Sequence, residues 1–159
     1  MRFVLLDQLI QIERGESAQA RAVFPATLPL FADHFPGHPI VPGVLLTETM
    51  CQTAGWLIAA TCDFSGWPLV VRIDRANFRR IVHADEPLEI AATLTASRDE
   101  TFEIQATTRV ANDVVADARL LFRLFRFDLT SDRSAALAAW GRETFAQLGG
   151  PSALAERDR

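Results

Sequence analysis

Lysine and tyrosine are absent from this chain of 159 residues, and cysteine, histidine and methionine are scarce. All sixteen basic side chains are therefore arginines, set against twenty carboxylates, which leaves a formal net charge of −4. This mildly acidic balance argues against general binding to nucleic acid, although a local group of arginines could still dock an acidic partner. Hydrophobic residues make up 49% of the chain, enough for the core of one domain and too many for a disordered protein.

The two cysteines offer neither a disulfide nor a metal site. Cys51 and Cys62 lie eleven residues apart in one predicted helix, too far from each other to be bridged. Neither belongs to a Cys-x-x-Cys pair, and the spacing of the three histidines suggests no metal. We interpret both cysteines as small buried apolar residues, and His38 and His83 as surface or turn residues.

No targeting or membrane segment is recognisable. The first sixteen residues lack the basic region and the small-residue cleavage site of a secretory signal. Residues 41–62 are long enough to cross a bilayer, but Glu48, Gln52 and several threonines make a membrane span a poor interpretation. The expectation is a soluble cytoplasmic protein with no membrane span.

Hydrophobic patterning predicts an α+β fold. Repeated prolines force an irregular path between residues 25 and 42, and Pro42 then stands where a first-turn proline belongs. Residues 43–61 are apolar nearly all round, as expected for a helix buried on most faces. Alternating residues predict strands at 17–24, 69–76, 88–95, 102–107 and 114–127. With no helix between the later strands, we expect a curved antiparallel sheet wrapped around a central helix.

The C-terminal segment is predicted to be an addition to this domain. Residues 131–148 form an amphipathic pattern with Leu137, Trp140 and Leu148 on one stripe, and Gly149-Gly150-Pro151 ends it. We therefore divide the chain into a main domain at 1–130, an appended helix at 131–150 and a flexible tail at 151–159. The helix is interpreted as a packing appendage on the edge of the sheet or of a dimer.

A single acid interrupts the predicted central helix. Glu48 is the only charged side chain between His38 and Trp56, and its helical face also carries Gln52, Gly55 and Ala59. An acid and an amide followed by small residues describe a polar spot that opens onto free space. Because burial raises the pKa of a carboxyl group, an acid placed there can act as a general acid. The alternative is a structural glutamate, capped by an arginine or a backbone amide.

Two further candidates precede Glu48. His34 stands before Phe-Pro-Gly-His-Pro, a segment with little conformational freedom, and histidine is the usual general base near neutral pH. Gly43 lies in the first helical turn, where its amide has no intrahelical partner and no side chain blocks an approaching carbonyl. Alternatively, His34 only bonds the loop backbone and Gly43 only serves the turn. Together, a base, an anion site and an acid suit proton abstraction beside a carbonyl, with loss of a β-leaving group.

The stretch from His34 to Gly55, HFPGHPIVPGVLLTETMCQTAG, resembles the signature of the FabZ-type (3R)-hydroxyacyl-[acyl-carrier-protein] dehydratases, which have the hot-dog fold. The spacing of His34 and Glu48 matches that family's catalytic pair, and Gly43 matches its oxyanion glycine. Gln52 and Gly55 also coincide with family positions. The segment RIDRANFRR looks like the family's strand with I-D-x-A-x-F.

The resemblance implies syn-elimination of water from a 3-hydroxyacyl thioester, without a metal or redox cofactor. His34 would remove the α-proton, the Gly43 N–H would stabilise the enolate-like oxygen, and Glu48 would protonate the departing hydroxyl. The residues implied to bind the substrate are Gln52, Gly55, Phe35 and Pro42. The implied partner is an acyl carrier protein that bears the acyl group on 4'-phosphopantetheine.

Two other functions remain open. A thioesterase of the same fold also places an acid on the central helix, but the histidine loop argues against it. A non-catalytic acyl-binding partner subunit could keep the motif for folding, but the intact pair of His34 and Glu48 argues against that role.

Carrier proteins are strongly acidic, so we expect docking on the densest basic cluster of the chain. This cluster consists of Arg72, Arg75, Arg79 and Arg80. These arginines could instead pair with Asp74, Asp85 or Glu86.

The run from His34 to Pro42 is predicted to be largely extended, which could carry the histidine far from the start of the helix. Glu48 lies more than a turn inside that helix, so the pair need not meet within one subunit. We therefore expect a homodimer or a dimer-based oligomer with two shared sites, as the resemblance also implies.

Overall fold

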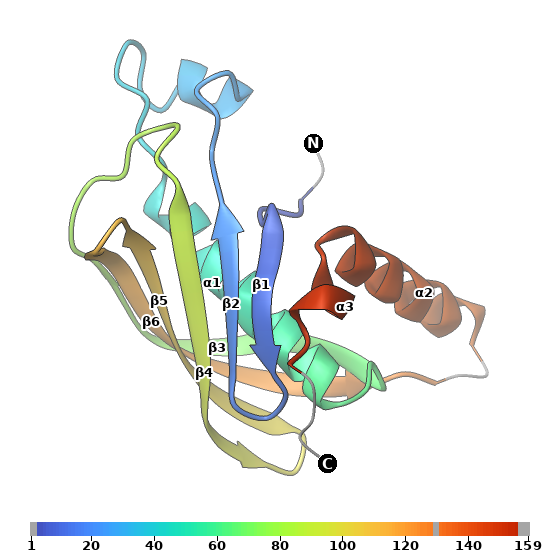
Figure 1. The fold of residues 1–159 in the computed structure, drawn as a ribbon. Coiled ribbons are helices and arrows are strands. Elements are labelled where there is room, and N and C mark those ends of the chain that lie inside the picture. The colour runs from blue at the N-terminus through green and yellow to red at the C-terminus, as the bar shows by residue number, and fades with distance from the viewer. Residues whose placement is uncertain (1–2, 129–130, 156–159) are drawn as a thin grey trace.

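A computed structural model describes residues 3–128 and 131–155. One antiparallel sheet curves around the long helix α1 (Gly43–Thr61), so the predicted α+β arrangement is confirmed (Figure 1). The strand order across the sheet is β1-β2-β4-β5-β6-β3. The strands are β1 (Gln8–Glu13), β2 (Ser17–Ala22), β3 (Gly66–Phe78), β4 (Leu88–Arg98), β5 (Thr101–Val110) and β6 (Asp113–Arg126).

Helix α1 is the centre of the core. Met50, Ala54 and Leu57 are fully buried, because the sheet wraps most faces of the helix. Two threonines are buried with them, and their hydroxyls donate to carbonyls of the same helix: Thr49 to Leu46 at 2.8 Å and Thr53 to Thr49 at 2.8 Å. These bonds satisfy polar groups that would otherwise be costly to bury.

No helix in the described part of the chain is long and apolar enough to span a membrane.

The concave face of the sheet is lined by alternating apolar residues. Ile104 on β5 pairs directly with Leu120 on β6, and both side chains are buried. Ala92 and Ala106 pair in the same way between β4 and β5, and their small side chains let the sheet approach the helix closely. Period-two burial therefore explains why these segments form strands with one face on the core.

Strand β3 is an edge strand with an unusually apolar free side. It spans 13 residues, and among the described residues it pairs only with β6. Five of its larger hydrophobic side chains are exposed: Leu69, Val70, Val71, Ile73 and Phe78. A long apolar edge of this kind is a surface that another chain can cover.

The connection between β2 and α1 folds back on itself beyond the end of the sheet, at the top of Figure 1. After the short helix η1 (Pro29–Ala32), the Ile40 N–H donates to the His34 carbonyl at 3.1 Å. Phe35 and His38 exchange two backbone hydrogen bonds of 3.2 and 2.8 Å inside this loop. The prediction of a largely extended run from His34 to Pro42 is therefore wrong. The prolines remove regular structure, but the amides between them close a compact loop.

The C-terminal helix α2 (Asp132–Gln147) forms where it was predicted, but its buried stripe differs. Leu137 and Trp140 are 39% and 44% exposed, whereas Ala138, Gly141 and Phe145 are buried. The reason is close docking, since a Cβ on Gly141 would lie only 2.7 Å from Cζ3 of Trp67. Leu148, the third residue of the predicted stripe, is buried as expected, but the small residues Ala138 and Gly141 face the domain in place of Leu137 and Trp140.

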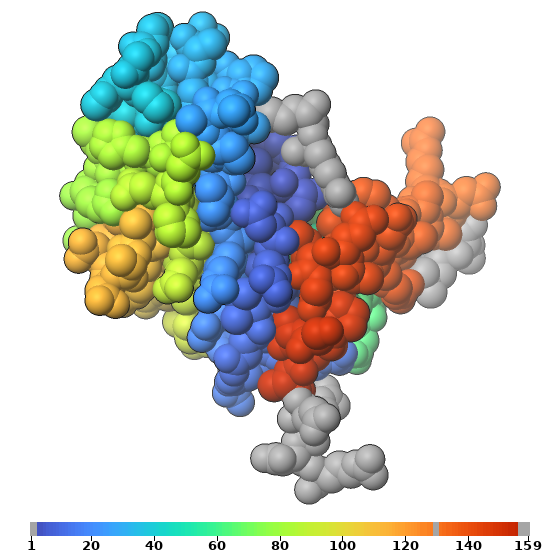
Figure 2. All heavy atoms as spheres, turned by 45° about the horizontal axis from the view of Figure 1, so that its top comes forward, coloured from blue at the N-terminus to red at the C-terminus, as the bar shows by residue number. Residues whose placement is uncertain are grey.

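The predicted flexible tail at 151–159 is wrong for residues 151–155. Helix α3 (Gly150–Ala153) follows α2, and Ala153 is buried. The Leu9 N–H donates to the Leu148 carbonyl at 2.8 Å, and the Ala155 N–H donates to the Ile12 carbonyl at 3.0 Å. Figure 2 shows the red C-terminal end of the described chain lying against β1, in dark blue, and the residue contacts there come from α3. Residues 156–159 lie outside the described part of the chain.

Candidate active site

Glu48 lies on the second turn of α1 and is half-buried. Its carboxylate accepts a hydrogen bond of 3.0 Å from Nε2 of Gln52, one turn further along the helix. The Gln52 amide is held in turn by the N-terminal segment: its oxygen accepts from the Leu5 N–H at 2.9 Å, and Nε2 reaches the Phe3 carbonyl at 3.2 Å. Within the described residues no arginine or backbone amide caps Glu48, so the alternative of a capped structural glutamate lacks its partner.

A cavity of about 270 Å³ opens beside Glu48. Glu48, Gln52, Gly55 and Ala59 all line it, which is the helix face that the sequence pattern predicts to open onto free space. Pro68–Val70 of β3 form a further part of its lining. The Glu48 carboxyl and the Gln52 amide are thus polar groups in a cavity lined mainly by apolar side chains, an arrangement suited to a ligand with an apolar chain and one polar end.

His34 is half-buried in the loop that precedes α1. Its Nδ1 lies 2.9 Å from the Ile40 carbonyl, and because a carbonyl can only accept, Nδ1 must be the donor. The neutral ring then carries its free lone pair on Nε2, as a general base requires. The His34 ring also stacks on Phe35, with the ring centres 4.3 Å apart. The loop therefore fixes both the tautomer and the orientation of the ring.

Gly43 is the first residue of α1, and its N–H makes no hydrogen bond within the described part of the chain. Phe78, at the end of β3, covers this glycine: a Cβ on Gly43 would lie 3.0 Å from Cε1 of the Phe78 ring. A side chain at position 43 would therefore need the ring to move. Sequence reasoning placed Phe78 in a family motif but gave it no role at the site.

The predicted site residues are not all brought together within one chain. Glu48, Gln52 and Gly55 line the cavity, whereas His34, Phe35 and Gly43 do not. Pro42 also lies outside the lining and precedes the helix, where its carbonyl accepts the Leu45 N–H at 2.9 Å. Phe35 is exposed at the tip of the loop.

Cys51 lines the same cavity and is buried, as predicted. Burial and the nearby charge of Glu48 raise the pKa of its thiol to about 12. Cys62, near the end of α1, is half-buried, and burial raises the pKa of its thiol as well. Neither thiol therefore supplies a thiolate nucleophile near neutral pH.

Three of the four clustered arginines are engaged with carboxylates. Arg72 pairs with Asp74 at 2.5 Å on the same strand. Arg80 donates two hydrogen bonds to Glu86, of 3.2 and 3.0 Å, and these lower the pKa of that carboxyl. The fourth residue, Arg75, makes no ion pair within the described residues.

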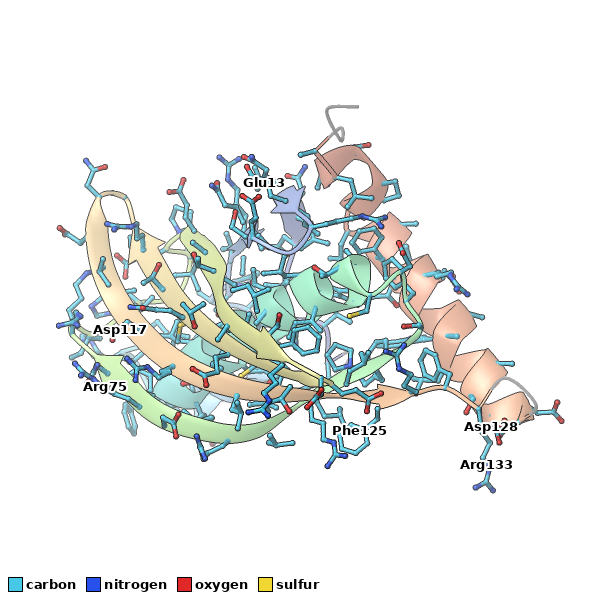
Figure 3. The ribbon with its side chains drawn as sticks, turned by 90° about the horizontal axis from the view of Figure 1, so that it is seen from below. Glu13, Arg75, Asp117, Phe125, Asp128 and Arg133 are labelled. Atoms are coloured by element: carbon cyan, nitrogen blue, oxygen red, sulfur yellow. The ribbon has the colours of Figure 1, made fainter. Side chains whose placement is uncertain are left out.

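Arg79 pairs with Asp117 on β6 at 2.6 Å, a partner that the sequence did not suggest. Partial burial acts to raise the pKa of Asp117, but hydrogen bonds from Asn77 and Arg79 outweigh it, so the pKa lies below its ordinary value. Figure 3 shows Asp117 at the same end of the sheet as Arg75, and both residues line one shallow hollow.

A family model described as ApeI dehydratase, of the ApeI-like family, matches residues 11–117. The chain belongs to this dehydratase family. The matched segment contains His34, Gly43 and Glu48 and ends before α2. A curated relative, the 3-hydroxyacyl-[acyl-carrier-protein] dehydratase FabZ of Caldicellulosiruptor saccharolyticus, is 33% identical over 123 residues, which cover 77% of this chain and 88% of the relative. The resemblance to the FabZ-type dehydratases is thereby confirmed.

Solved structures with the same fold include both dehydratases and thioesterases. The dehydratase heterocomplex ApeI:P from Xenorhabdus doucetiae has a TM-score of 0.61 at 15% identity, covering 77% of this chain and 84% of that one. The thioesterase HI1161 from Haemophilus influenzae has a TM-score of 0.58 at 13% identity, covering 74% of this chain and 77% of that one. These neighbours confirm the hot-dog fold. The fold alone does not choose between the two activities, and the matched sequence favours the dehydratase.

Proposed function

We propose that the protein dehydrates (3R)-hydroxyacyl thioesters to trans-2-enoyl thioesters, in fatty-acid, lipid or polyketide biosynthesis in the cytoplasm. The observation that carries this proposal is the position of Glu48 in an otherwise largely apolar cavity, within a segment that matches a dehydratase family. A 3-hydroxyacyl thioester has the corresponding shape, with its reacting hydroxyl near the polar end of an alkyl chain.

In the proposed reaction, Nε2 of His34 removes the proton from Cα of the substrate. The electrons of the broken C–H bond form the Cα–Cβ double bond through an enolate-like species. The oxygen of this species accepts a hydrogen bond from the free Gly43 N–H. Glu48 gives its proton to the Cβ hydroxyl, which leaves as water. The proton taken by His34 is then returned through solvent to the Glu48 carboxylate, so the enzyme ends the cycle unchanged.

The proposed active unit is a homodimer. Two observations support it: the free edge of β3 exposes a row of apolar side chains, and His34 does not line the cavity that contains Glu48. Pairing of two β3 edges around a two-fold axis would cover the exposed row. In such a dimer the histidine loop of one subunit can complete the cavity of the other, and each dimer has two equivalent sites.

The proposed substrate carrier is an acyl carrier protein, attached to the acyl group through 4'-phosphopantetheine. Docking of this acidic partner remains assigned to Arg72, Arg75, Arg79 and Arg80. Because the other three are engaged with carboxylates, the main free charge in this group belongs to Arg75.

The test of the proposed function is incubation of the protein with the crotonyl thioester of pantetheine. Reversible hydration lowers the enoyl absorbance and yields 3-hydroxybutyryl-pantetheine, which mass spectrometry identifies; this is the expected result. Release of free thiol without the hydroxy product would instead show a thioesterase. Binding without either product would show a non-catalytic acyl-binding subunit, and both of these outcomes would overturn the proposal.

A further inference from the structure

We infer that Trp140, on the appended helix α2, closes the far end of the cavity beside Glu48 and limits the length of the acyl chain that the cavity accepts. The inference rests on the proposed function, because it assigns the cavity to an acyl chain. It gives the C-terminal helix a role in substrate selection.

The cavity follows α1 for about three turns. Ala59 lies eleven residues beyond Glu48, and both residues line the cavity, so its ends are separated by about 16 Å along the helix axis. Trp56, near the Ala59 end, contacts Trp67 with ring centres 5.9 Å apart. Trp67 contacts Trp140 with ring centres 5.3 Å apart. Trp140 itself lines the cavity, and this chain of ring contacts places it toward the end that is distant from Glu48.

Close packing holds Trp140 in this position. The neighbouring Gly141 lies so near the Trp67 ring that a Cβ would meet it at 2.7 Å. One turn later Phe145 is buried, with its ring 5.8 Å from Trp56 and 4.9 Å from Phe64. Helix α2 is therefore anchored directly next to Trp140 and again one turn beyond it, which holds the backbone of Trp140 against the domain.

Trp140 is also the outermost of the three tryptophans. Trp56 is 7% exposed and Trp140 is 44% exposed, so solvent lies on the far side of the Trp140 ring. A chain that reaches this ring must stop, bend or push it outward. Removing the indole would open the cavity to the surface and let a longer chain continue.

A wall of this kind can discriminate strongly between chain lengths. A single methylene that a hydrophobic pocket cannot accommodate changes selectivity by about tenfold to two-hundredfold. The wall comes from residues beyond the segment that matches the family model, which ends at residue 117. The length limit would therefore be a property of this chain's own C-terminal extension.

The test is the binding of a series of saturated acyl-pantetheine thioesters, from butyryl to hexadecanoyl, measured by calorimetry. The proteins are the parent, Trp140→Ala, Trp140→Phe, and Leu137→Ala as a control from the same helix. Leu137 is 39% exposed and does not line the cavity, so this control should match the parent throughout. Far-UV circular dichroism and a thermal melt establish that each variant is folded.

The affinity of the parent protein for the thioesters should rise with acyl chain length and then stop rising at a limiting length. In Trp140→Ala the rise should continue, giving at least tenfold tighter binding than the parent for the first chain beyond the limit. Trp140→Phe, which keeps a smaller ring, should fall between the two and still tests the inference if the alanine variant does not fold. The same limiting length in the parent and both variants would overturn the inference.

Saturated thioesters cannot be dehydrated, so this result does not depend on turnover. If the parent does not hydrate the crotonyl thioester, the proposed reaction is overturned, whereas the limit on chain length still stands on its own binding data. If the enzyme is active but the limiting chain length is the same in the parent and the Trp140 variants, only the role of Trp140 is overturned.

Discussion

The side-chain amide of Gln52 donates a 3.0 Å hydrogen bond to the Glu48 carboxylate, while the backbone of Phe3 and Leu5 holds that amide in place. A residue of the central helix and the N-terminal segment thus fix the orientation of the acid together. Since Gln52 can only donate through Nε2, the Glu48 oxygen that faces it must act as the acceptor. The other carboxyl oxygen is then the one available to carry a proton toward a substrate.

Replacing Glu48 with glutamine should keep the fold and abolish the reaction. The new side chain is nearly isosteric, and its amide oxygen can still accept the hydrogen bond from Gln52. It cannot donate the required proton, so kcat should fall by at least about a hundredfold. Steady-state turnover together with a thermal melt measures both effects. Activity within about threefold of the parent would remove Glu48 from the mechanism.

Replacing His34 with alanine should abolish activity without a large loss of stability. The side chain is half-buried and makes one hydrogen bond within its own loop, through Nδ1 to Ile40. Its loss should change the free energy of unfolding by about 1 kcal/mol. Chemical denaturation measures this change. A much larger destabilisation would indicate that His34 serves the loop structure, which was the alternative interpretation of this residue.

The face of α1 that lines the cavity could be predicted from the sequence. Helix geometry places Glu48, Gln52 and Gly55 on one side because of their spacing. The compact loop before α1 could not be predicted, because it depends on the hydrogen bond from Ile40 to His34 and not on local preference. The partner of Arg79 was missed for a related reason: Asp117 is close only after β3 and β6 have paired.

The contact face of the C-terminal helix α2 could not be predicted from the sequence either. Its presence and approximate ends follow from its pattern, whereas its contact face depends on Gly141 fitting against the Trp67 ring. A glycine carries no hydrophobic signal, so the hydrophobic pattern favours Leu137 and Trp140 as core residues, and both are exposed in the structure.

Replacing Arg75 with alanine should weaken the use of a carrier-bound substrate and leave a small thioester unaffected. Arg75 is the member of its cluster without an ion pair in the described residues, so its charge is free to attract an acidic partner. We expect the KM for the carrier-bound substrate to rise about threefold to tenfold, with the difference shrinking as salt is added. Assays with acyl carrier protein and with pantetheine thioesters compare the two substrates.

Arg98 provides the matched control for this experiment. It is highly exposed on β4, which is separated from β3 by two strands, and Arg98→Ala changes the net charge by the same amount. An equal rise in KM for both variants, or for both substrates, would contradict docking at Arg75.

The buried thiol of Cys51 should resist alkylation in the folded protein. With its pKa raised to about 12, it stays protonated at pH values where an unfolded cysteine ionises. Mass spectrometry after iodoacetamide treatment near pH 9 should show Cys51 unmodified in the native protein and fully modified in denaturant. Because the folded state holds this proton more tightly, stability should also fall as the pH rises from about 9 toward 12. Rapid labelling of the native thiol would contradict the burial of this side chain.

The most direct measurement of the shared site is complementation between two inactive variants. His34→Ala and Glu48→Gln proteins are unfolded, mixed in equal amounts and refolded together, and each variant refolded alone serves as the control. Random pairing makes about half of the dimers mixed, and each mixed dimer has one intact site and one doubly defective site. Activity should therefore return to roughly a quarter of the parental value. If His34 and Glu48 of the same chain formed each site, no intact site could arise, and the mixture would stay as inactive as the two variants alone.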